Sequence, residues 1–403
     1  MVYDCIIAIY HFGMRIASNL NPKAALWIHG RIGVLERIER EVEFTDAKTV
    51  WIHCASLGEF EMARPIIDGL NTSNRPPRIV LTFFSPSGYE IRKTYAGVAH
   101  VFYLPQEGKA NAIRFIKAIR PDVAIFVKYD LWWHYLNAAK NFGSNLILIS
   151  AQFSSNHYFF KWFGGHGRKC LAAFNHIFVV DDNSMLLLHQ IGITTVEVCG
   201  DTRYDRVMEI ASQWKSLPVV DYFKGDRNLI VCGSTWAKDE EVLKPSIEEN
   251  PTIKWIIAPH EVDEPNMIRL EGLFPNSVRF SRYSNQNTNV ILIDSIGVLS
   301  QIYGAADLAY VGGAFDSGLH NILEATAFGV PVIFGPNYSR FTDAKVMIDE
   351  GLAFSVSNSE GLKNTLSLHL TQTNKKEALL AFMIKRTGAK KSILAYLETT
   401  LSK

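Results

Sequence analysis

Short apolar runs rich in β-branched residues alternate with longer helical stretches along the whole chain. Strands that are almost continuously apolar and are separated by helices are typical of parallel sheets that helices cover on both faces. This alternation therefore predicts parallel α/β architecture throughout. We expect strands at 49–54, 78–84, 99–104, 122–128, 145–151, 176–181, 195–199, 228–233, 253–258, 289–293, 307–311, 331–334 and 353–356.

A chain of 403 residues is too long for one ordinary hydrophobic core. The break lies within 205–227, where a helical stretch is followed by a polar segment around Gly225. We predict two doubly wound α/β domains facing one another across a cleft, over 35–210 and 211–403, preceded by a separate region at 1–34. In such sheets ligands bind just beyond the carboxyl ends of the strands.

The charge balance and the cysteines exclude several classes of protein. There are 41 basic and 40 acidic residues, so the chain lacks the basic excess that binding to nucleic acid needs. The five cysteines form no C-x-x-C pair, which argues against a zinc site or a disulfide framework and favours a reducing compartment.

The first twenty residues are mostly apolar, yet Asp4, His11, Arg15 and Asn19 form a polar stripe on a helix. No uninterrupted apolar run of roughly 20 residues occurs there, and no basic leader precedes the apolar part. We predict an amphipathic helix that lies on a membrane surface rather than a spanning helix or a signal peptide. A packed surface helix of the first domain is the alternative.

The richest strand–helix junction runs from 307 to 336. A buried strand ends in Gly312-Gly313, and a segment with His320 and Asn321 then leads into a helix that carries Glu324. Glycines after a strand let backbone approach a ligand closely, and a helix start offers unpaired N–H groups to an anion. No G-x-G-x-x-G follows a strand, which argues against a dehydrogenase. The alternative is that these glycines only shape tight turns.

A second junction places a carboxylate at a helix start. The strand at 49–54 is followed by a turn and then by a helix beginning near Glu59, whose apolar face would be buried. From spacing alone, Glu59 is equally a possible base and a carboxylate favoured by the helix dipole. We expect Glu61 to be solvated and His53 to be a satisfied core histidine. The dipole should also weaken Glu59 as a base, unless apolar surroundings or desolvation offset it.

Several motifs occur in an order that resembles a known family. They are A-S-L-G-E-F at 55–60, V-C-G-D-T-R-Y-D at 198–205, G-S-T at 233–235, A-P-H at 258–260, D-S-I-G-V-L at 294–299 and G-G…H-N-x-L-E from 312 to 324. Together they cover most of the chain and resemble the bacterial Kdo (3-deoxy-D-manno-octulosonic acid) transferases. The resemblance implies an inverting glycosyltransferase of the GT-B fold, with two Rossmann-like domains, that moves Kdo from CMP-Kdo onto a lipid A precursor in lipopolysaccharide biosynthesis.

The resemblance also implies roles for residues of the first, acceptor-binding domain. Glu59 occupies the place of the family's catalytic base, and Asp130 matches the second acid of an E-T-E-L-W motif. Lys128, which stands where many relatives carry the first Glu of that motif, and Arg203, which matches a family lysine, take the places of residues that stabilise the transition state in the family. Lys128 could instead contact the Kdo carboxylate or an acceptor phosphate. Either basic residue could also be an ordinary ion-pair partner.

The family's contacts to CMP map onto the second, donor-binding domain. His260 replaces the usual Arg and Val298 the usual Glu, so the phosphate would depend more on the backbone amides near Gly312 and Gly313. No metal or other cofactor is expected, because a helix start and one or two cations could neutralise the single phosphate of CMP. The positions carried over are Pro259, His260, Ile296, Gly297, Val298, Asn321, Ile322, Leu323 and Glu324.

The predicted partners are CMP-Kdo, a lipid A precursor and the membrane surface, at the cytoplasmic face of the inner membrane, with peripheral or N-terminal anchoring. Two alternatives stay open at this point. One is another GT-B nucleotide-sugar transferase or epimerase, and the other is a non-catalytic nucleotide-sugar-binding protein. A membrane scaffold would leave the segment at 307–336 unexplained.

Overall fold

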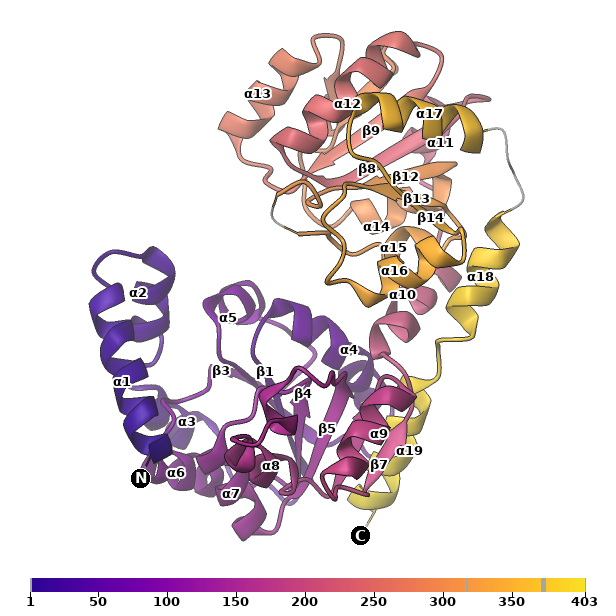
Figure 1. Ribbon diagram of the computed structural model, residues 1–403. Coiled ribbons are helices and arrows are strands. Elements are labelled where there is room, and N and C mark those ends of the chain that lie inside the picture. The colour runs from indigo at the N-terminus through magenta and orange to yellow at the C-terminus, as the bar shows by residue number, and fades with distance from the viewer. Residues whose placement is uncertain (1, 317, 371–374, 403) are drawn as a thin grey trace. The chain divides into compact units, whose positions relative to one another are not determined.

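The computed structural model describes residues 2–316, 318–370 and 375–402. The chain forms two compact units, Met1–Arg206 together with Thr387–Lys403, and Val207–Arg386 (Figure 1). Each unit is built around its own sheet of seven parallel strands. The expected α/β class and the two Rossmann-like units of the GT-B fold are confirmed, whereas the expected cleft between the two units stays a prediction.

The sheet of the first unit has the strand order β3-β2-β1-β4-β5-β6-β7. The chain reverses direction across the sheet between β1 and β4, and such a switch point is where parallel sheets of this kind bind ligands. The strands are β1 Thr49–Cys54, β2 Arg78–Phe83, β3 His100–Tyr103, β4 Val123–Val127, β5 Asn145–Ala151, β6 His176–Val179 and β7 Val196–Val198.

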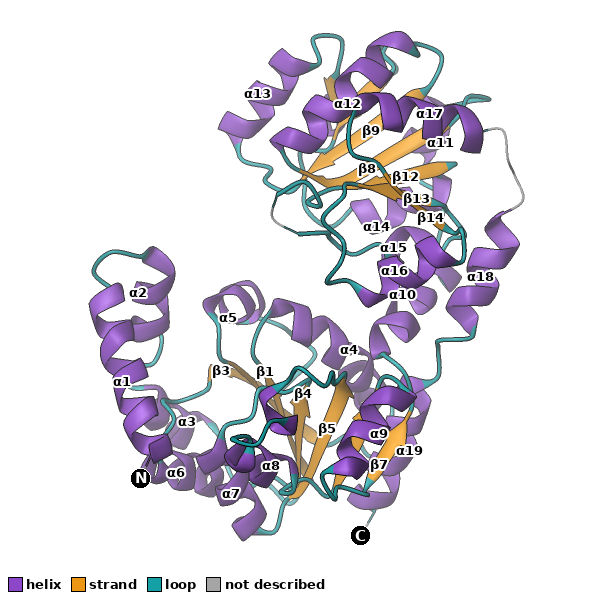
Figure 2. Ribbon diagram, viewed as in Figure 1, coloured by secondary structure: helices purple, strands orange, loops and turns teal. Residues whose placement is uncertain are grey.

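Helices cover both faces of this sheet (Figure 2). Side chains alternate along β1, so that Trp51 packs into one core while Val50 and Ile52 pack into the other. The helices are α1 Val2–Ala17, α2 Pro22–His29, α3 Val34–Glu41, α4 Leu57–Asn71, α5 Pro86–Arg92, α6 Lys109–Ile119, α7 Trp133–Phe142, η1 Tyr158–Phe160, α8 Gly165–Leu171, α9 Asp182–Gln190, α10 Thr202–Ser212 and α19 Ala389–Leu401.

The second unit repeats the plan with the strand order β10-β11-β9-β8-β12-β13-β14. Its strands are β8 Leu229–Thr235, β9 Lys254–Pro259, β10 Val278–Arg279, β11 Val290–Leu292, β12 Leu308–Val311, β13 Val332–Phe334 and β14 Ala353–Ser355. Its helices are α11 Pro218–Lys224, α12 Ala237–Glu249, α13 Glu264–Leu273, η2 Phe280–Arg282, α14 Leu299–Ile302, η3 Tyr303–Ala305, α15 Leu323–Thr326, α16 Thr342–Asp349, α17 Ser359–His369 and α18 Lys376–Ile384. Every predicted strand is present within two residues; β10 was missed because two residues are too few to show a pattern.

The predicted second domain, 211–403, is wrong at its carboxyl end, because Thr387–Lys403 belongs to the first unit. The helix α19 buries Ile393 and Leu397 in the core that α4 also covers. The carboxylate of Asp205 accepts hydrogen bonds from the backbone N–H groups of Gly388 (2.9 Å) and Lys390 (3.2 Å) at the start of α19. The sequence showed an amphipathic helix there but not which sheet it covers. The boundary also falls after Arg206 rather than after residue 210, within α10.

The helix α1 presents its apolar side outward. None of its residues is buried, and its polar His11 is less exposed than the apolar Ile9, which is 72% exposed. Ring contacts of Tyr10 with Trp27 and a hydrogen bond from Tyr3 Oη to Glu107 (2.7 Å) hold it against its own unit. Within the described residues, no helix is long and apolar enough to cross a membrane. The predicted helix is confirmed, and its association with a membrane surface stays a prediction.

Candidate functional site

Glu59 lies where the sequence placed it, in the first turn of α4 just after β1. Phe60 and Ile66 are fully buried and fix the side of α4 that packs on the sheet, which leaves Glu59 at the sheet's carboxyl edge. Glu59 Oε2 accepts a hydrogen bond from the backbone N–H of Ala55. The same stretch of chain therefore sets both the position and the orientation of this carboxyl group.

The pKa of Glu59 is raised to about 7. Burial is the largest cause, and the nearby carboxylate of Asp130 raises the pKa further. The backbone N–H groups of Ala55 and Ser56 and the ammonium of Lys128 act in the opposite direction. The expected weakening by the helix start is thus present, but desolvation outweighs it. A carboxyl group with a pKa near the ambient pH is well matched to taking up a proton.

Lys128 and Asp130 follow β4 directly and lie near Glu59, as the charge effects on Glu59 require. The backbone of Lys128 has φ of +60°, a left-handed conformation that residues with side chains seldom adopt. Its N–H donates to the carbonyl of Ile149 on β5 (2.9 Å), which holds the chain in this turn. Such strained residues gather at functional sites.

The partner of Asp130 is a residue that we expected to be only a core histidine. His53 is completely buried, and its Nε2 lies 2.8 Å from Asp130 Oδ2. The same oxygen accepts a hydrogen bond from Trp132 Nε1 (2.9 Å). His53 is therefore satisfied, as expected, but it connects β1 to the acidic group beside Glu59. Glu61, which we expected to be solvated, is only partly exposed and forms an ion pair with Arg92 of α5 (3.0 Å).

Arg203 is held by a neighbouring acid. Its backbone N–H and its Nε each lie 2.9 Å from an oxygen of Asp201, and its Nη2 lies 2.8 Å from Asp201 Oδ2. The ion-pair alternative is thus what the structure shows, with Arg203 about one-third exposed. Its predicted role in stabilising the transition state stays a prediction.

In the second unit, the glycines after β12 are held by a buried acid. The carboxylate of Asp239 accepts from the N–H groups of Gly313 and Trp236 (both 2.9 Å) and from Tyr310 Oη (2.8 Å). A side chain at Gly312 would come within 2.4 Å of the carbonyl oxygen of Ser234, and Gly313 has φ of +93°. The glycines thus permit a close approach of two loops as well as a turn. Sequence reasoning missed Asp239, whose only signal is its place in the first turn of α12.

Three aromatic rings stack beside these glycines. His260 contacts both Trp236 and His320, with its ring centroid 4.6 Å from that of each. Trp236 Nε1 donates to His320 Nε2 (3.0 Å), so this nitrogen carries no proton. Burial, and then the neighbouring His260, lower the pKa of His320 to about 4. His260 is exposed at the carboxyl end of β9, as predicted. The ring contacts that Trp236 and His320 make with it were not predicted from the sequence.

The remaining predicted donor residues also follow strands of this sheet. Asn321 Nδ2 donates to Glu324 Oε1 (3.0 Å), while the side chains of Ile322 and Leu323 are buried and offer a ligand only their backbone. The expected helix that carries Glu324 is present as α15, which is four residues long. Ile296 is exposed after β11, Gly297 has φ of +94°, Val298 is partly exposed and Pro259 is buried at the end of β9.

Comparison with known proteins shows which proteins the chain is similar to. The model of the 3-deoxy-D-manno-octulosonic-acid transferase (kdotransferase) family matches residues 22–206. The transferase of that name from Chlamydophila psittaci is 27% identical over 85% of this chain and 82% of its own length. The Rickettsia typhi one is 25% identical over 92% of this chain and 82% of its length. The family model covers less than half of the chain, and the similarity to these transferases extends over most of it. In the family's S-x-G-E motif, the acidic residue is Glu59 of this chain.

The fold of this chain also occurs in enzymes that act on nucleotide sugars. UDP-GlcNAc 2-epimerase from Neisseria meningitidis, solved with UDP-GlcNAc, has a TM-score of 0.62 and 14% identity over 87% of this chain and all of the other. A UDP-N-acetylglucosamine 2-epimerase from Listeria monocytogenes described as putative has a TM-score of 0.61 and 14% identity, over 88% and 97%. Both likenesses show the fold alone.

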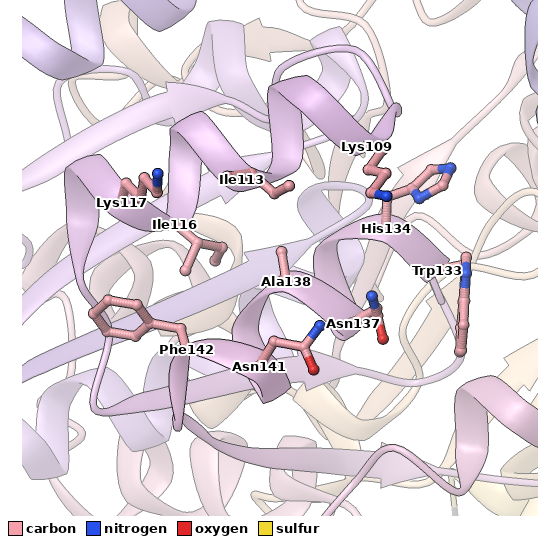
Figure 3. A pocket seen from close by; sticks show the side chains of 10 residues that line it. All are labelled: Lys109, Ile113, Ile116, Lys117, Trp133, His134, Asn137, Ala138, Asn141 and Phe142. Atoms are coloured by element: carbon pink, nitrogen blue, oxygen red, sulfur yellow. The ribbon is translucent and has the colours of Figure 1, made fainter.

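A groove of about 410 Å³ lies apart from the candidate residues, between α6 and α7 (Figure 3). Lys109 and His134 lie near one end, and Lys117 and Phe142 near the other (Figure 3). It contains none of the family's motif residues. In the described ranges, no three His, Cys, Asp or Glu side chains lie close enough together to hold a metal ion.

Proposed function

We propose that this protein is an inverting glycosyltransferase that moves Kdo from CMP-Kdo onto a lipid A precursor in lipopolysaccharide biosynthesis. The match of residues 22–206 to the Kdo transferase family model and the similarity of most of the chain to a Kdo transferase support this reaction. The observation that carries the proposal is Glu59, a largely buried carboxyl group with a pKa of about 7 at the carboxyl edge of the first sheet. We further propose that the reaction needs no metal ion.

In this proposal the ionised Glu59 removes the proton of an acceptor hydroxyl as the oxygen attacks the anomeric carbon of Kdo. The new C–O bond forms on one face of the sugar, while the bond to the CMP phosphate breaks on the other, so the configuration inverts. Lys128 adds a positive charge near Glu59, suited to the Kdo carboxylate or an acceptor phosphate. The charge that builds on the leaving phosphate would be met by backbone N–H groups and cations.

We place CMP-Kdo on the second unit, beside the loops that follow β8, β9, β11 and β12. Parallel pairing brings these loops to one edge of the sheet. Asp239 fixes the Gly312-Gly313 turn, and the ring stack leaves His260 at the surface. His320 is neutral at pH 7, because its pKa is about 4. The phosphate would therefore be bound by backbone amides and by hydrogen bonds rather than by that ring as a cation.

We propose that the first unit works at the cytoplasmic face of the inner membrane, as a peripheral or N-terminally anchored protein. The apolar residues of α1 face outward, and Trp162 and Phe163 are 92% and 61% exposed beside Lys161. Tyr3 of α1 stacks on His166 (4.6 Å), which joins α1 to the segment after these aromatics. Aromatic and basic side chains together are typical of membrane interfaces.

The experiment is incubation of the full chain with CMP-Kdo and a tetra-acylated lipid A precursor, followed by mass spectrometry of the lipid. A mass gain of Kdo that is lost in Glu59→Gln and unaffected by a chelator is expected, with Glu61→Gln as the matched control on the same helix. An active Glu59→Gln variant would refute the base, and loss of activity with the chelator would refute metal independence. Protection against thermal unfolding by UDP rather than by CMP would favour the epimerase-like alternative.

Unchanged lipid in the wild-type reaction, together with intact CMP binding, would instead favour the non-catalytic nucleotide-sugar-binding alternative. Binding of CMP alone cannot separate the two, because both need the same donor site. The lipid product decides between them.

A further inference from the structure

A buried chain of hydrogen bonds runs from the core of the first sheet to Asp130. Trp51 Nε1 donates to Thr82 Oγ1 (2.8 Å), and this oxygen lies 2.9 Å from His53 Nδ1. The other nitrogen of His53, Nε2, lies 2.8 Å from Asp130 Oδ2. Trp51, Thr82 and His53 are completely buried. A core position filled only for packing would not need a ring with both nitrogens engaged.

The donors and acceptors of this chain assign the proton on His53. An indole N–H can only donate, so Thr82 Oγ1 accepts from Trp51. The hydroxyl proton of Thr82 then goes to His53 Nδ1 at 2.9 Å rather than to the carbonyl of Ile52 at 3.5 Å. Nδ1 is thus the acceptor, and a neutral imidazole must carry its proton on Nε2. That proton points at the carboxylate of Asp130.

Asp130 lies among several titratable groups. Glu59 on α4, Cys54 on β1 and Tyr10 on α1 all have pKa values that the charge of Asp130 raises. Lys128, in the same loop, lowers the pKa of Glu59 and so opposes the effect of Asp130 on it. The position of the Asp130 carboxylate therefore affects the pKa of Glu59. Two donors, His53 and Trp132, hold that carboxylate through its Oδ2 atom.

We propose that His53 is a positioning residue for the transfer reaction, which holds the carboxylate of Asp130 in the orientation in which its charge acts on Glu59. His53 touches no substrate; it acts through Asp130. This inference rests on the proposed function, because it takes Glu59 as the base. It adds a residue of β1 that sets the behaviour of the base from within the core.

Two replacements of His53 separate its two hydrogen bonds. In His53→Gln the longer side chain can place an amide N–H near the position of Nε2 and so keep a donor to Asp130. In His53→Asn the shorter amide can reach Thr82 but leaves Asp130 without this donor. Both variants keep a polar group in the buried site. A difference between them therefore reports the bond to Asp130 rather than the packing.

The readout is the pH dependence of kcat with saturating CMP-Kdo. We expect His53→Gln to keep the acidic limb near pH 7 and kcat within about threefold of wild type. In His53→Asn the limb should move to lower pH, since an Asp130 carboxylate that is displaced from Glu59 raises the pKa of Glu59 less. The plateau kcat should fall about three- to tenfold as the base weakens, with KM for CMP-Kdo unchanged.

Asp130→Asn should reproduce the shift of His53→Asn, and the double variant should add nothing further. Additive effects, or an acidic limb that stays in place in His53→Asn, would overturn the proposal. Absence of Kdo transfer by the wild-type chain would instead contradict the proposed function. Nitrogen NMR of His53 at pH 7 needs no activity and no variant: the neutral ring protonated on Nε2 supports the inference, and any other form refutes it.

Discussion

The raised pKa of Glu59 has a consequence for stability that can be measured without any substrate. A carboxyl group that moves from the ordinary pKa of 4.5 to about 7 on folding binds its proton more tightly in the folded state. Its contribution to the free energy of unfolding is full below pH 4.5 and is lost as the pH rises to 7. At about 1.4 kcal/mol for each pKa unit, the loss is about 3 kcal/mol. The glutamine of Glu59→Gln cannot ionise, so this variant does not lose this stability as the pH rises.

We therefore expect Glu59→Gln to gain about 3 kcal/mol relative to wild type between pH 4.5 and pH 8. Hydrogen exchange of the slowest amides of β1, β4 and β5 measures this, with wild type and variant compared at the same pH so that intrinsic exchange rates cancel. Glu61→Gln on the same helix controls for the loss of a negative charge near the helix start. The same wild-type-to-variant difference at both pH values would refute the burial argument.

Three further outcomes test other parts of the structure. Lys128→Met should raise the pKa of Glu59 and move the acidic limb of kcat to higher pH, because it removes a charge that favours the ionised carboxylate. Replacing Trp162 and Phe163 together by Ser should weaken co-sedimentation with anionic lipid vesicles while leaving CMP binding intact. Asp205→Ala should weaken the docking of α19 by about 1–2 kcal/mol, seen as faster proteolysis after residue 387.

Much of the fold was accessible from the sequence because parallel strands buried on both faces are apolar over their whole length. The strand at 145–151 is predicted to the residue, and its neighbours differ only at their ends. The docking of α19 was not accessible. An amphipathic helix shows that it must cover something, whereas its partner here is a sheet assembled from residues more than two hundred positions earlier. The structure shows the return through the burial of Ile393 and Leu397 and through the hydrogen bonds from Gly388 and Lys390 to Asp205.

The same division holds for the candidate site. Glu59 could be placed because it follows a strand of a parallel sheet at the start of a helix, whereas Lys128 and Asp130 were singled out by the family resemblance. The hydrogen bond between His53 and Asp130 could not be predicted, since it depends on the side-chain conformations of both residues. Asp239 was hidden for the same reason: an acid in the first turn of a helix commonly only caps it, and here it also binds the turn at Gly313.

The positive charge at residue 128 has a physical explanation. Burial and the charge of Asp130 raise the pKa of Glu59 to about 7, and Lys128 is among the groups that lower this pKa. A second acid at 128 would raise the pKa further, so that less of the base would be ionised at neutral pH. With Asp130 retained, a lysine at 128 keeps about half of Glu59 ionised at pH 7. The departure from the family's usual acid is therefore compatible with a working base, provided that this lysine keeps its charge.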